Sequence, residues 1–238
     1  MRLDLAVAEK FALSRSKAVK LIERGEVRVG GEIRLKAAFE VKAGDLIELE
    51  KLPEYASFGG EKLAKALKDF DFSVKDMVCA DLGASNGGFT SCLIKNGAKK
   101  VYAVDVGECA LPPELKSDER VVVKDKTNAR YLKREDIGEE CDLVVIDVSF
   151  ISLTLILPAV KEILKSSGYI IALIKPQFEV GKKALGKSGI VTNVKEREKS
   201  IEKIRDCAKA LDLVERDLTS APQRQNKNLE FLILLSKK

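Results

Sequence analysis

The segment DLGASNGGFT, residues 81–90, constrains the fold of this chain more than any other. It follows the apolar run MVCA and leads into SCLIKNG, an order that predicts a strand, a glycine-rich turn and a helix. The turn does not match a dinucleotide site, because Gly83 is followed by Ser85 where G-x-G-x-x-G needs glycine. It does not match a P-loop, because no lysine follows the last glycines and Asp81 would repel a pyrophosphate.

Apolar strands alternate with amphipathic helices after residue 60. This order predicts an α/β fold, a Rossmann-like domain with a mostly parallel sheet and helices on both faces. In such sheets a ligand binds at the carboxyl ends of the strands. The expected helices are 62–70, 87–97, 152–168 and 194–213, and the expected strands are 76–83, 99–107, 120–125, 141–150, 169–178, 213–220 and 229–236.

Three carboxylates end three successive expected strands, namely Asp81, Asp105 and Asp125. Each alone is more often a turn residue, but three beside a glycine turn favour a ligand site. S-adenosylmethionine fits, because Asp81 can hold its ammonium, Asp105 its ribose hydroxyls and Asp125 its adenine amino group. We therefore expect this cofactor, with contacts from Asp81, Gly83, Ser85, Gly87, Gly88, Asp105 and Asp125.

Residues 1–51 predict a small α+β domain. Helical spacing over 3–13 is followed by a helix starting at Ser14 and ending at Gly25, and then by short strand-like pieces. Residues 1–36 hold nine Lys or Arg against five acids, and Lys17, Lys20 and Arg24 share a helix face. A basic stripe of this kind is often only a solvated face.

The basic stretch is more particular than a charge stripe, because RLD … SRSKAVKLIERGEVRVGG resembles the αL RNA-binding module of ribosomal protein S-four. The resemblance implies contacts with structured RNA through its phosphates. We expect residues 52–59 to form a linker and residues 60–238 to form the second domain. The expected RNA contacts, carried over by position, are Arg2, Arg15, Lys17, Lys20 and Arg24.

Composition narrows the class of protein. The formal net charge of +5 permits a nucleic-acid partner without requiring one. Five dispersed cysteines and no histidine leave almost no zinc ligands and favour reduced thiols, so we expect no metal and a cytoplasmic protein. The longest apolar runs are strand-sized and the start of the chain lacks a secretory apolar core, so we expect no membrane partner. A monomer is expected.

Four further charges are placed to meet at one edge of the sheet. Asp147 and Lys175 end two expected strands, Lys62 opens a helix and Glu230 opens the last strand. Each alone is most simply a solvated end charge. Together they would surround a reacting group beside the cofactor.

Several stretches together are similar to the haemolysin A (TlyA) type ribosomal RNA 2′-O-methyltransferases, relatives of the FtsJ-like ribose methyltransferases. The resemblance implies 2′-O-methylation of a cytidine in ribosomal RNA, of the large subunit for a compact member such as this. It implies a catalytic tetrad of Lys62, Asp147, Lys175 and Glu230, with Lys175 at the hydroxyl as base or alkoxide stabiliser. It also adds Lys126 and Asn128 to the cofactor site. The matching stretches are GGEKL, DLGASNGGFT, VYAVDVG, TNARYL, DVSFISL, KPQFEVGK, GKSGIV and NLEFL.

The sequence departs from the family pattern at one position, and three other functions are also considered. Phe58 occupies a position where the family usually has arginine. The chain could instead be an RNA-binding protein whose methyltransferase domain is inactive, a ribose methyltransferase acting on tRNA or a snoRNA-type target, or a pore-forming haemolysin. The last would need an export signal and membrane-active segments, neither of which the sequence displays.

Overall fold

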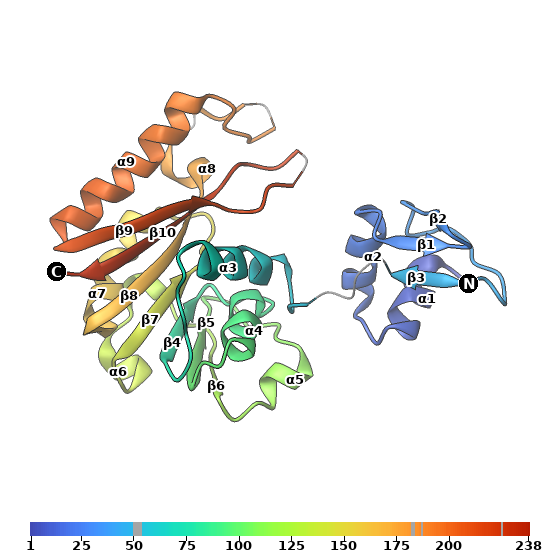
Figure 1. Cartoon of the computed structure of the whole chain (residues 1–238), viewed down its shortest axis with the longest axis horizontal. Coiled ribbons are helices and arrows are strands. Elements are labelled where there is room, and N and C mark those ends of the chain that lie inside the picture. The colour runs from blue at the N-terminus through green and yellow to red at the C-terminus, as the bar shows by residue number, and fades with distance from the viewer. Residues whose placement is uncertain (50–53, 182–183, 187, 225) are drawn as a thin grey trace. The chain divides into compact units, whose positions relative to one another are not determined.

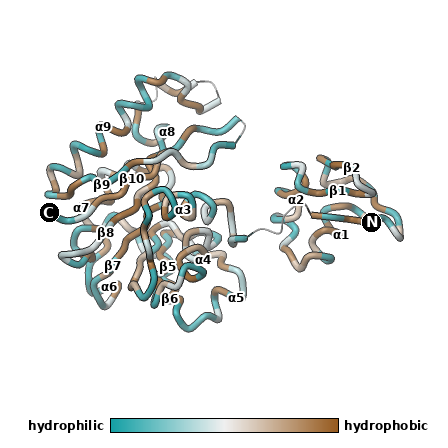
Figure 2. Tube along the Cα trace, viewed as in Figure 1, coloured by the Kyte–Doolittle hydropathy of each residue, from teal (hydrophilic) through white to brown (hydrophobic). Residues whose placement is uncertain are grey.

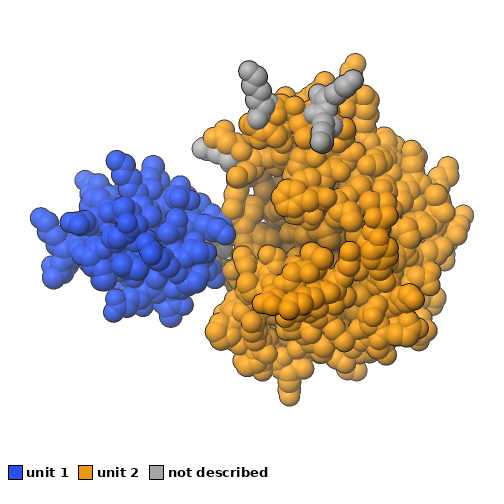
Figure 3. All heavy atoms as spheres, turned by 180° about the vertical axis from the view of Figure 1, so that it is seen from behind, with its two compact units in different colours: residues 1–53 blue, residues 54–238 orange. Residues whose placement is uncertain are grey.

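The computed structural model describes residues 1–238 apart from 50–53, 182–183, 187 and 225 (Figure 1). The chain divides into two compact units, Met1–Pro53 and Glu54–Lys238 (Figure 3). Of the expected linker 52–59, residues 52 and 53 lie outside the described residues. Its last two residues are helical, because helix α3 (Phe58–Asp69) starts directly after Ser57, whose Oγ accepts a hydrogen bond from the Gly59 N–H.

The first unit packs two helices on a small antiparallel sheet of strand order β2-β1-β3. Ser14 caps the second helix as expected, accepting a hydrogen bond from the Lys17 N–H at 3.3 Å. Gly30 and Gly31, with φ of +60° and +81°, form the turn between β1 and β2. The elements are α1 (Leu3–Lys10), α2 (Arg15–Glu23), β1 (Val27–Val29), β2 (Glu32–Ile33) and β3 (Ile47–Leu49).

The second unit is built on a seven-stranded sheet of order β6-β5-β4-β7-β8-β10-β9. The first five strands in this order are mutually parallel, whereas β10 runs antiparallel to both β8 and β9. The prediction of a mostly parallel sheet is confirmed. The strands are β4 (Val78–Leu82), β5 (Lys100–Val104), β6 (Val121–Lys124), β7 (Cys141–Ile146), β8 (Leu164–Ile174), β9 (Leu213–Ser220) and β10 (Phe231–Lys237).

Helices cover both faces of this sheet, as the apolar strands predicted. In Figure 2 the central strands are mostly hydrophobic, whereas hydrophilic and hydrophobic residues alternate along the surrounding helices. Alternate residues of β4 enter two cores: Ala80 joins the core under α7 and α9, and Cys79 joins the core under α3 and α4. The helical segments besides α3 are α4 (Gly88–Lys95), α5 (Pro113–Lys116), η1 (Ala129–Tyr131), α6 (Arg134–Ile137), η2 (Leu153–Leu155), α7 (Leu157–Ile163), α8 (Pro176–Glu179) and α9 (Val194–Ala210).

One expected helix is shorter than the sequence pattern indicated. The pattern placed a helix over 152–168, but α7 ends at Ile163 and β8 begins at Leu164. Leu164 is fully buried and pairs with Cys141 of β7, after which the register shifts. Pairing with a neighbouring strand therefore overrides the local helix preference of this stretch.

Helices α3 and α4 approach so closely that only glycine fits between them. A Cβ on Gly60 would lie 2.3 Å from Tyr55 Cβ and 2.8 Å from the Gly88 carbonyl oxygen. A Cβ on Gly88 would lie 2.2 Å from Ser57 Oγ. These glycines hold the first turn of α3 against the first turn of α4.

We predict that Gly60→Ala lowers the free energy of unfolding by about 1–3 kcal/mol, because the added methyl overlaps backbone and the base of Tyr55. Gly60 lies in the first turn of α3, so the helix-propensity gain from alanine is smaller than the roughly 1 kcal/mol of a helix interior and does not offset this loss. Urea unfolding measures the difference. Gly181→Ala is the control, because no described atom lies within 4 Å of its added Cβ. Equal stability of the two variants would contradict the close-packing account.

Candidate active site

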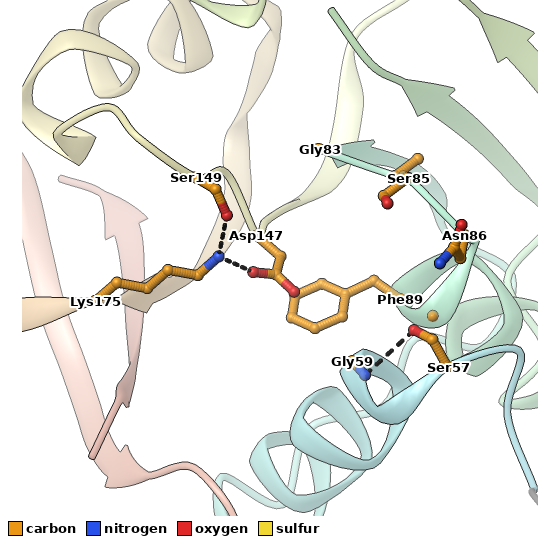
Figure 4. A pocket seen from close by; sticks show the side chains of 11 residues that line it. Ser57, Gly59, Gly83, Ser85, Asn86, Phe89, Asp147, Ser149 and Lys175 are labelled. Carbon is orange, nitrogen blue, oxygen red and sulfur yellow. Dashed lines mark hydrogen bonds and ion pairs between the residues drawn. The ribbon is translucent and has the colours of Figure 1, made fainter. Parts of the chain in front are cut away.

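A cavity of about 160 Å³ opens at the carboxyl edge of the sheet, beside the first turns of α3 and α4 (Figure 4). Five residues expected from the sequence line it: Gly83, Ser85, Gly88, Asp147 and Lys175. The volume suits part of a small ligand, since whole-ligand pockets are usually about 300 Å³ or more. The other lining residues are Ser57, Gly59, Ala84, Asn86, Phe89 and Ser149.

A buried ion pair forms one wall of this cavity. Lys175 follows β8 and is only 8% exposed, and its Nζ lies 2.6 Å from Oδ1 of Asp147, which follows β7. The same Nζ donates a hydrogen bond to Ser149 Oγ at 2.9 Å, and Figure 4 shows both contacts converging on the ammonium. Burying two charges is costly, so such a pair is retained where its geometry serves a purpose.

The other two expected catalytic residues form a second ion pair. Lys62 Nζ of α3 lies 2.5 Å from Oε2 of Glu230, which directly precedes β10. Glu230 Oε1 accepts a hydrogen bond of 3.2 Å from Gln177 Nε2 of α8, the helix that Lys175 precedes. The four residues thus form two pairs linked through α8, and only the pair of Lys175 and Asp147 lines the cavity.

The glycine turn is fixed by its contact with β7. Gly83 has φ of +88°, and a Cβ there would lie 2.6 Å from the Asp147 carbonyl oxygen. Gly87 also has positive φ and starts α4 without a side-chain cap. The turn therefore presents bare backbone to the cavity, which permits close approach of a ligand.

Asp81 is fully buried at the end of β4, under this turn. Its Oδ2 accepts a hydrogen bond from Thr90 Oγ1 at 2.6 Å, while Oδ1 has no partner among the described residues. Burial raises the pKa of Asp81 to about 7, the Thr90 hydrogen bond opposes this rise, and the negative charge of Asp147 adds to it. An unpaired buried carboxylate oxygen is suited to a cationic or hydrogen-bond-donating ligand.

Asp105 and Asp125 lie on the same edge but do not line the cavity. Asp105 accepts backbone hydrogen bonds from Ser85 at 2.9 Å and from Gly107 at 2.8 Å, so it shapes the glycine turn. Asp125 Oδ1 accepts one from the Cys109 N–H at 2.6 Å, which lowers the pKa of the Asp125 carboxyl. Both carboxylates keep lone pairs for a ligand.

Lys126 and Asn128 have local partners instead. Lys126 Nζ lies 3.2 Å from Glu108 Oε1 in an exposed pair. Asn128 caps η1 through a hydrogen bond of 3.0 Å from the Arg130 N–H to its Oδ1. Neither residue lines the cavity.

Four polar or aromatic lining residues were missed by sequence reasoning: Ser57, Asn86, Phe89 and Ser149. Asn86 and Phe89 lie within the glycine segment 81–90, and Ser149 lies two residues after Asp147. Their proximity to these motifs could have indicated that they line the site. Ser57 had none, since it reaches the cavity only through the packing of α3 on α4.

An exposed aromatic side chain stands next to Ser149. Phe150 is 90% exposed and has φ of +64°, a conformation that costs a non-glycine residue about 1–3 kcal/mol. Its ring centroid lies 5.1 Å from that of Phe178, and Lys175 Nζ lies 5.9 Å from the Phe178 centroid. Strain and exposure together point to a functional surface beside the ion pair.

The basic residues of the first unit are partly engaged with an internal carboxylate. Asp4 is buried and accepts two hydrogen bonds from Arg2 and one from Arg15 Nε at 2.9 Å. The Arg2 hydrogen bonds hold the pKa of the Asp4 carboxyl well below its usual range. Lys20 and Arg24 are exposed on α2 and just after it, and Lys17 of the same helix is half-buried.

All five cysteines are free thiols, and four of them are buried. Within the described residues no group of three or more His, Cys, Asp or Glu side chains is placed to hold a metal ion. The helices in the described part of the chain include none that is both long and apolar enough to cross a membrane.

Comparison with known proteins finds a matching family model for each of the two units. Residues 55–237 match the model of the FtsJ-like methyltransferase family, and residues 1–47 match the S4 domain. Hemolysin A of Brachyspira hyodysenteriae is 42% identical, with 98% of each chain covered. The 23S rRNA (cytidine-2′-O)-methyltransferase TlyA of Campylobacter jejuni is 33% identical, with 97% of each chain covered. A solved Streptococcus thermophilus structure described as a hemolysin is 39% identical, with a TM-score of 0.80 over 100% of this chain and 88% of that one.

The raised pKa of Asp81 predicts a pH-dependent stability. The unfolded state releases the Asp81 proton near pH 3.8 and the folded state near pH 7, so ionisation favours unfolding across that interval. We expect ligand-free Asp81→Asn to be more stable than the unsubstituted protein at pH 8, by up to about 4 kcal/mol, with the difference vanishing towards pH 4. Urea unfolding at several pH values measures it.

Asp125→Asn is the opposite-sign control, because the Asp125 pKa is lowered and its carboxylate stabilises the fold above pH 4. A constant stability difference for Asp81→Asn from pH 4 to pH 8 would contradict the account.

Proposed function

The chain belongs to the FtsJ-like methyltransferase family, and from this we propose that it methylates the 2′-hydroxyl of a cytidine in ribosomal RNA, using S-adenosylmethionine. The observation that carries the proposal is the buried pair of Lys175 and Asp147 lining a cavity beside a glycine turn. A relative that is 33% identical to this chain, with 97% of each chain covered, is named for this reaction on 23S rRNA. We therefore propose the large subunit as the source of the acceptor, and a cytoplasmic monomer as the acting form.

The residues present fit S-adenosylmethionine. The unpaired oxygen of buried Asp81 suits its ammonium group, and the bare backbone of Gly83, Ser85, Gly87 and Gly88 admits its amino-acid portion. We assign its ribose to Asp105 and its adenine to the segment Asp125–Asn128, which includes Lys126. When bound, the cofactor supplies an electrophilic methyl group.

We assign Lys175 to the acceptor hydroxyl. The hydroxyl proton passes to solvent ahead of bond formation, so negative charge develops on the oxygen. As that oxygen bonds to the methyl carbon, the methyl–sulfur bond would break and leave a neutral thioether. Lys175 Nζ, held in place by Asp147 and Ser149, stabilises this charge from a side chain that is only 8% exposed. Most of the acceleration then comes from placing the hydroxyl in line with the methyl group. Lys62 and Glu230 fix α3 against β10 and so support that geometry.

The S4 domain supplies the affinity for RNA in this proposal. Exposed Lys20 neutralises phosphate, with Lys17 beside it on α2 and Arg24, which also pairs with Glu26 at 3.4 Å, just after the helix. Arg15 uses only Nε on Asp4, so its two Nη groups stay available to phosphate, while Arg2 keeps both N–H groups of Nη1 and one of Nη2. Such contacts position the RNA without reading its sequence.

Phe150 completes the acceptor site as a stacking surface. A base held outside its helix needs an aromatic face to replace the neighbours that it leaves. Phe150 is exposed, is held in a strained conformation and lies one residue after Ser149, which contacts Lys175. We propose that the base of the acceptor nucleotide stacks on it.

The proposal is tested by transfer of labelled methyl from S-adenosylmethionine to purified small subunits, large subunits and tRNA that lack the modification. Label in large subunits alone supports it, and label in tRNA alone would move the function to another RNA. Binding of S-adenosylmethionine without transfer to any RNA would support an inactive RNA-binding protein instead.

Replacing Lys175 removes the positive charge at the hydroxyl. We predict that Lys175→Ala lowers the transfer rate at least about 100-fold while the dissociation constant for S-adenosylmethionine changes less than about threefold. Lys165→Ala is the matched control, since it breaks a partly buried pair with Asp142 at the other end of the same strand. Single-turnover transfer and equilibrium dialysis measure the two quantities. Retention of most activity by Lys175→Ala would contradict the assignment.

Replacing Phe150 tests the stacking surface. We predict that Phe150→Ala lowers transfer about tenfold or more, since stacking of a base on an aromatic ring is worth about 1–3 kcal/mol, and that Phe150→Tyr restores it. Unfolding measurements provide the control, because removing an exposed side chain in a strained conformation should not destabilise the fold. Full activity of Phe150→Ala would exclude the stacking role.

A further inference from the structure

An arginine and a phenylalanine from distant parts of the chain stack at the start of α3. The guanidinium carbon of Arg224, in the connection between β9 and β10, lies 3.3 Å from the ring centroid of Phe58. Phe58 is the first residue of α3, and the next residue, Gly59, lines the cavity. The stack therefore holds a guanidinium beside the cavity on an aromatic support.

The charge of Arg224 is not balanced within the described structure. Lys175 and Lys62 each pair with a carboxylate, whereas no ion pair or side-chain hydrogen bond joins Arg224 to any described residue. Its Nη2 is buried and has no hydrogen-bond partner among the described residues. The remainder of the side chain is half-buried. A guanidinium ordered by stacking and lacking a carboxylate is suited to an anion from outside the chain.

The chemistry of the acceptor identifies that anion. In RNA the 2′-hydroxyl and the 3′-phosphate stand on neighbouring carbons of one ribose, so a hydroxyl placed at Lys175 brings a phosphodiester to the rim of the cavity. Gly59 lines the cavity, and Phe58 directly precedes it at the start of α3. We propose that Arg224, oriented by Phe58, binds a backbone phosphate of the RNA next to the reacting nucleotide. The proposal rests on the proposed function.

Arg224→Ala is expected to act on RNA binding alone. With unmodified large subunits as substrate, we expect KM to rise about tenfold at 0.15 M salt, while kcat and S-adenosylmethionine binding change less than about twofold. The slope of log KM against log salt concentration should fall by about 0.7–0.9, the amount that one lost phosphate contact produces. A residue that only stabilised the loop would alter the melting temperature and leave this slope unchanged.

Two further variants distinguish the effect of the Arg224–Phe58 stack on KM from the effect of net positive charge. Lys227→Ala removes one exposed positive charge from the same connection, and it should change KM less than about twofold. Phe58→Leu keeps Arg224 but removes its support, so it should raise KM in the same direction by about threefold. The double variant Arg224→Ala with Phe58→Leu should add little to Arg224→Ala, because the two residues act as one unit.

The outcomes distinguish this inference from the proposed function. If the unsubstituted protein transfers no methyl group to any RNA, the proposed function fails and this inference fails with it. If transfer occurs but Arg224→Ala keeps KM and the salt slope, only the inference is overturned. An effect of Lys227→Ala equal to that of Arg224→Ala would also overturn it, because a general loss of charge would then explain both.

Discussion

The buried ion pair between Lys175 and Asp147 is the interaction on which the candidate site depends. Parallel pairing aligns Ile146 of β7 with Ala172 of β8, so the residues that follow these strands emerge at one edge. Lysine is long enough for its Nζ to reach the shorter aspartate across that alignment. Burying the two charges carries a desolvation penalty, and separating them would leave a buried charge unpaired. Ser149 contacts Lys175, and the glycine turn packs against the backbone of Asp147.

The second ion pair, between Lys62 and Glu230, depends on the antiparallel edge of the sheet. Because β10 inserts between β8 and β9, the residue that precedes it, Glu230, reaches Lys62 of α3. Gln177 of α8 contacts the same carboxylate, and α8 starts directly after Lys175. The start of α3 is thereby tied to both ion pairs. In the proposed function, a site assembled from four segments holds its groups in place for in-line transfer.

Residues that follow apolar strands could be predicted from the sequence, whereas contacts made by loops could not. Asp81, Asp147 and Lys175 were placed correctly at one edge because strand polarity in a parallel sheet fixes where strands end. Ser57 and the stack of Arg224 on Phe58 depend on helix packing and on a connection more than 150 residues away, neither of which leaves a local pattern. The early end of α7 shows the same limit, since strand pairing decided it.

The position of the transferred methyl group tests the central claim most directly. Large ribosomal subunits lacking the modification would be incubated with the protein and S-adenosylmethionine, and their RNA digested to nucleosides for mass spectrometry. The account predicts one new nucleoside, cytidine carrying its methyl group on the ribose, because the charge of Lys175 is placed to stabilise a hydroxyl oxygen. A methyl group on a base nitrogen or carbon would contradict it, since neither reaction calls for a buried cation at an alkoxide.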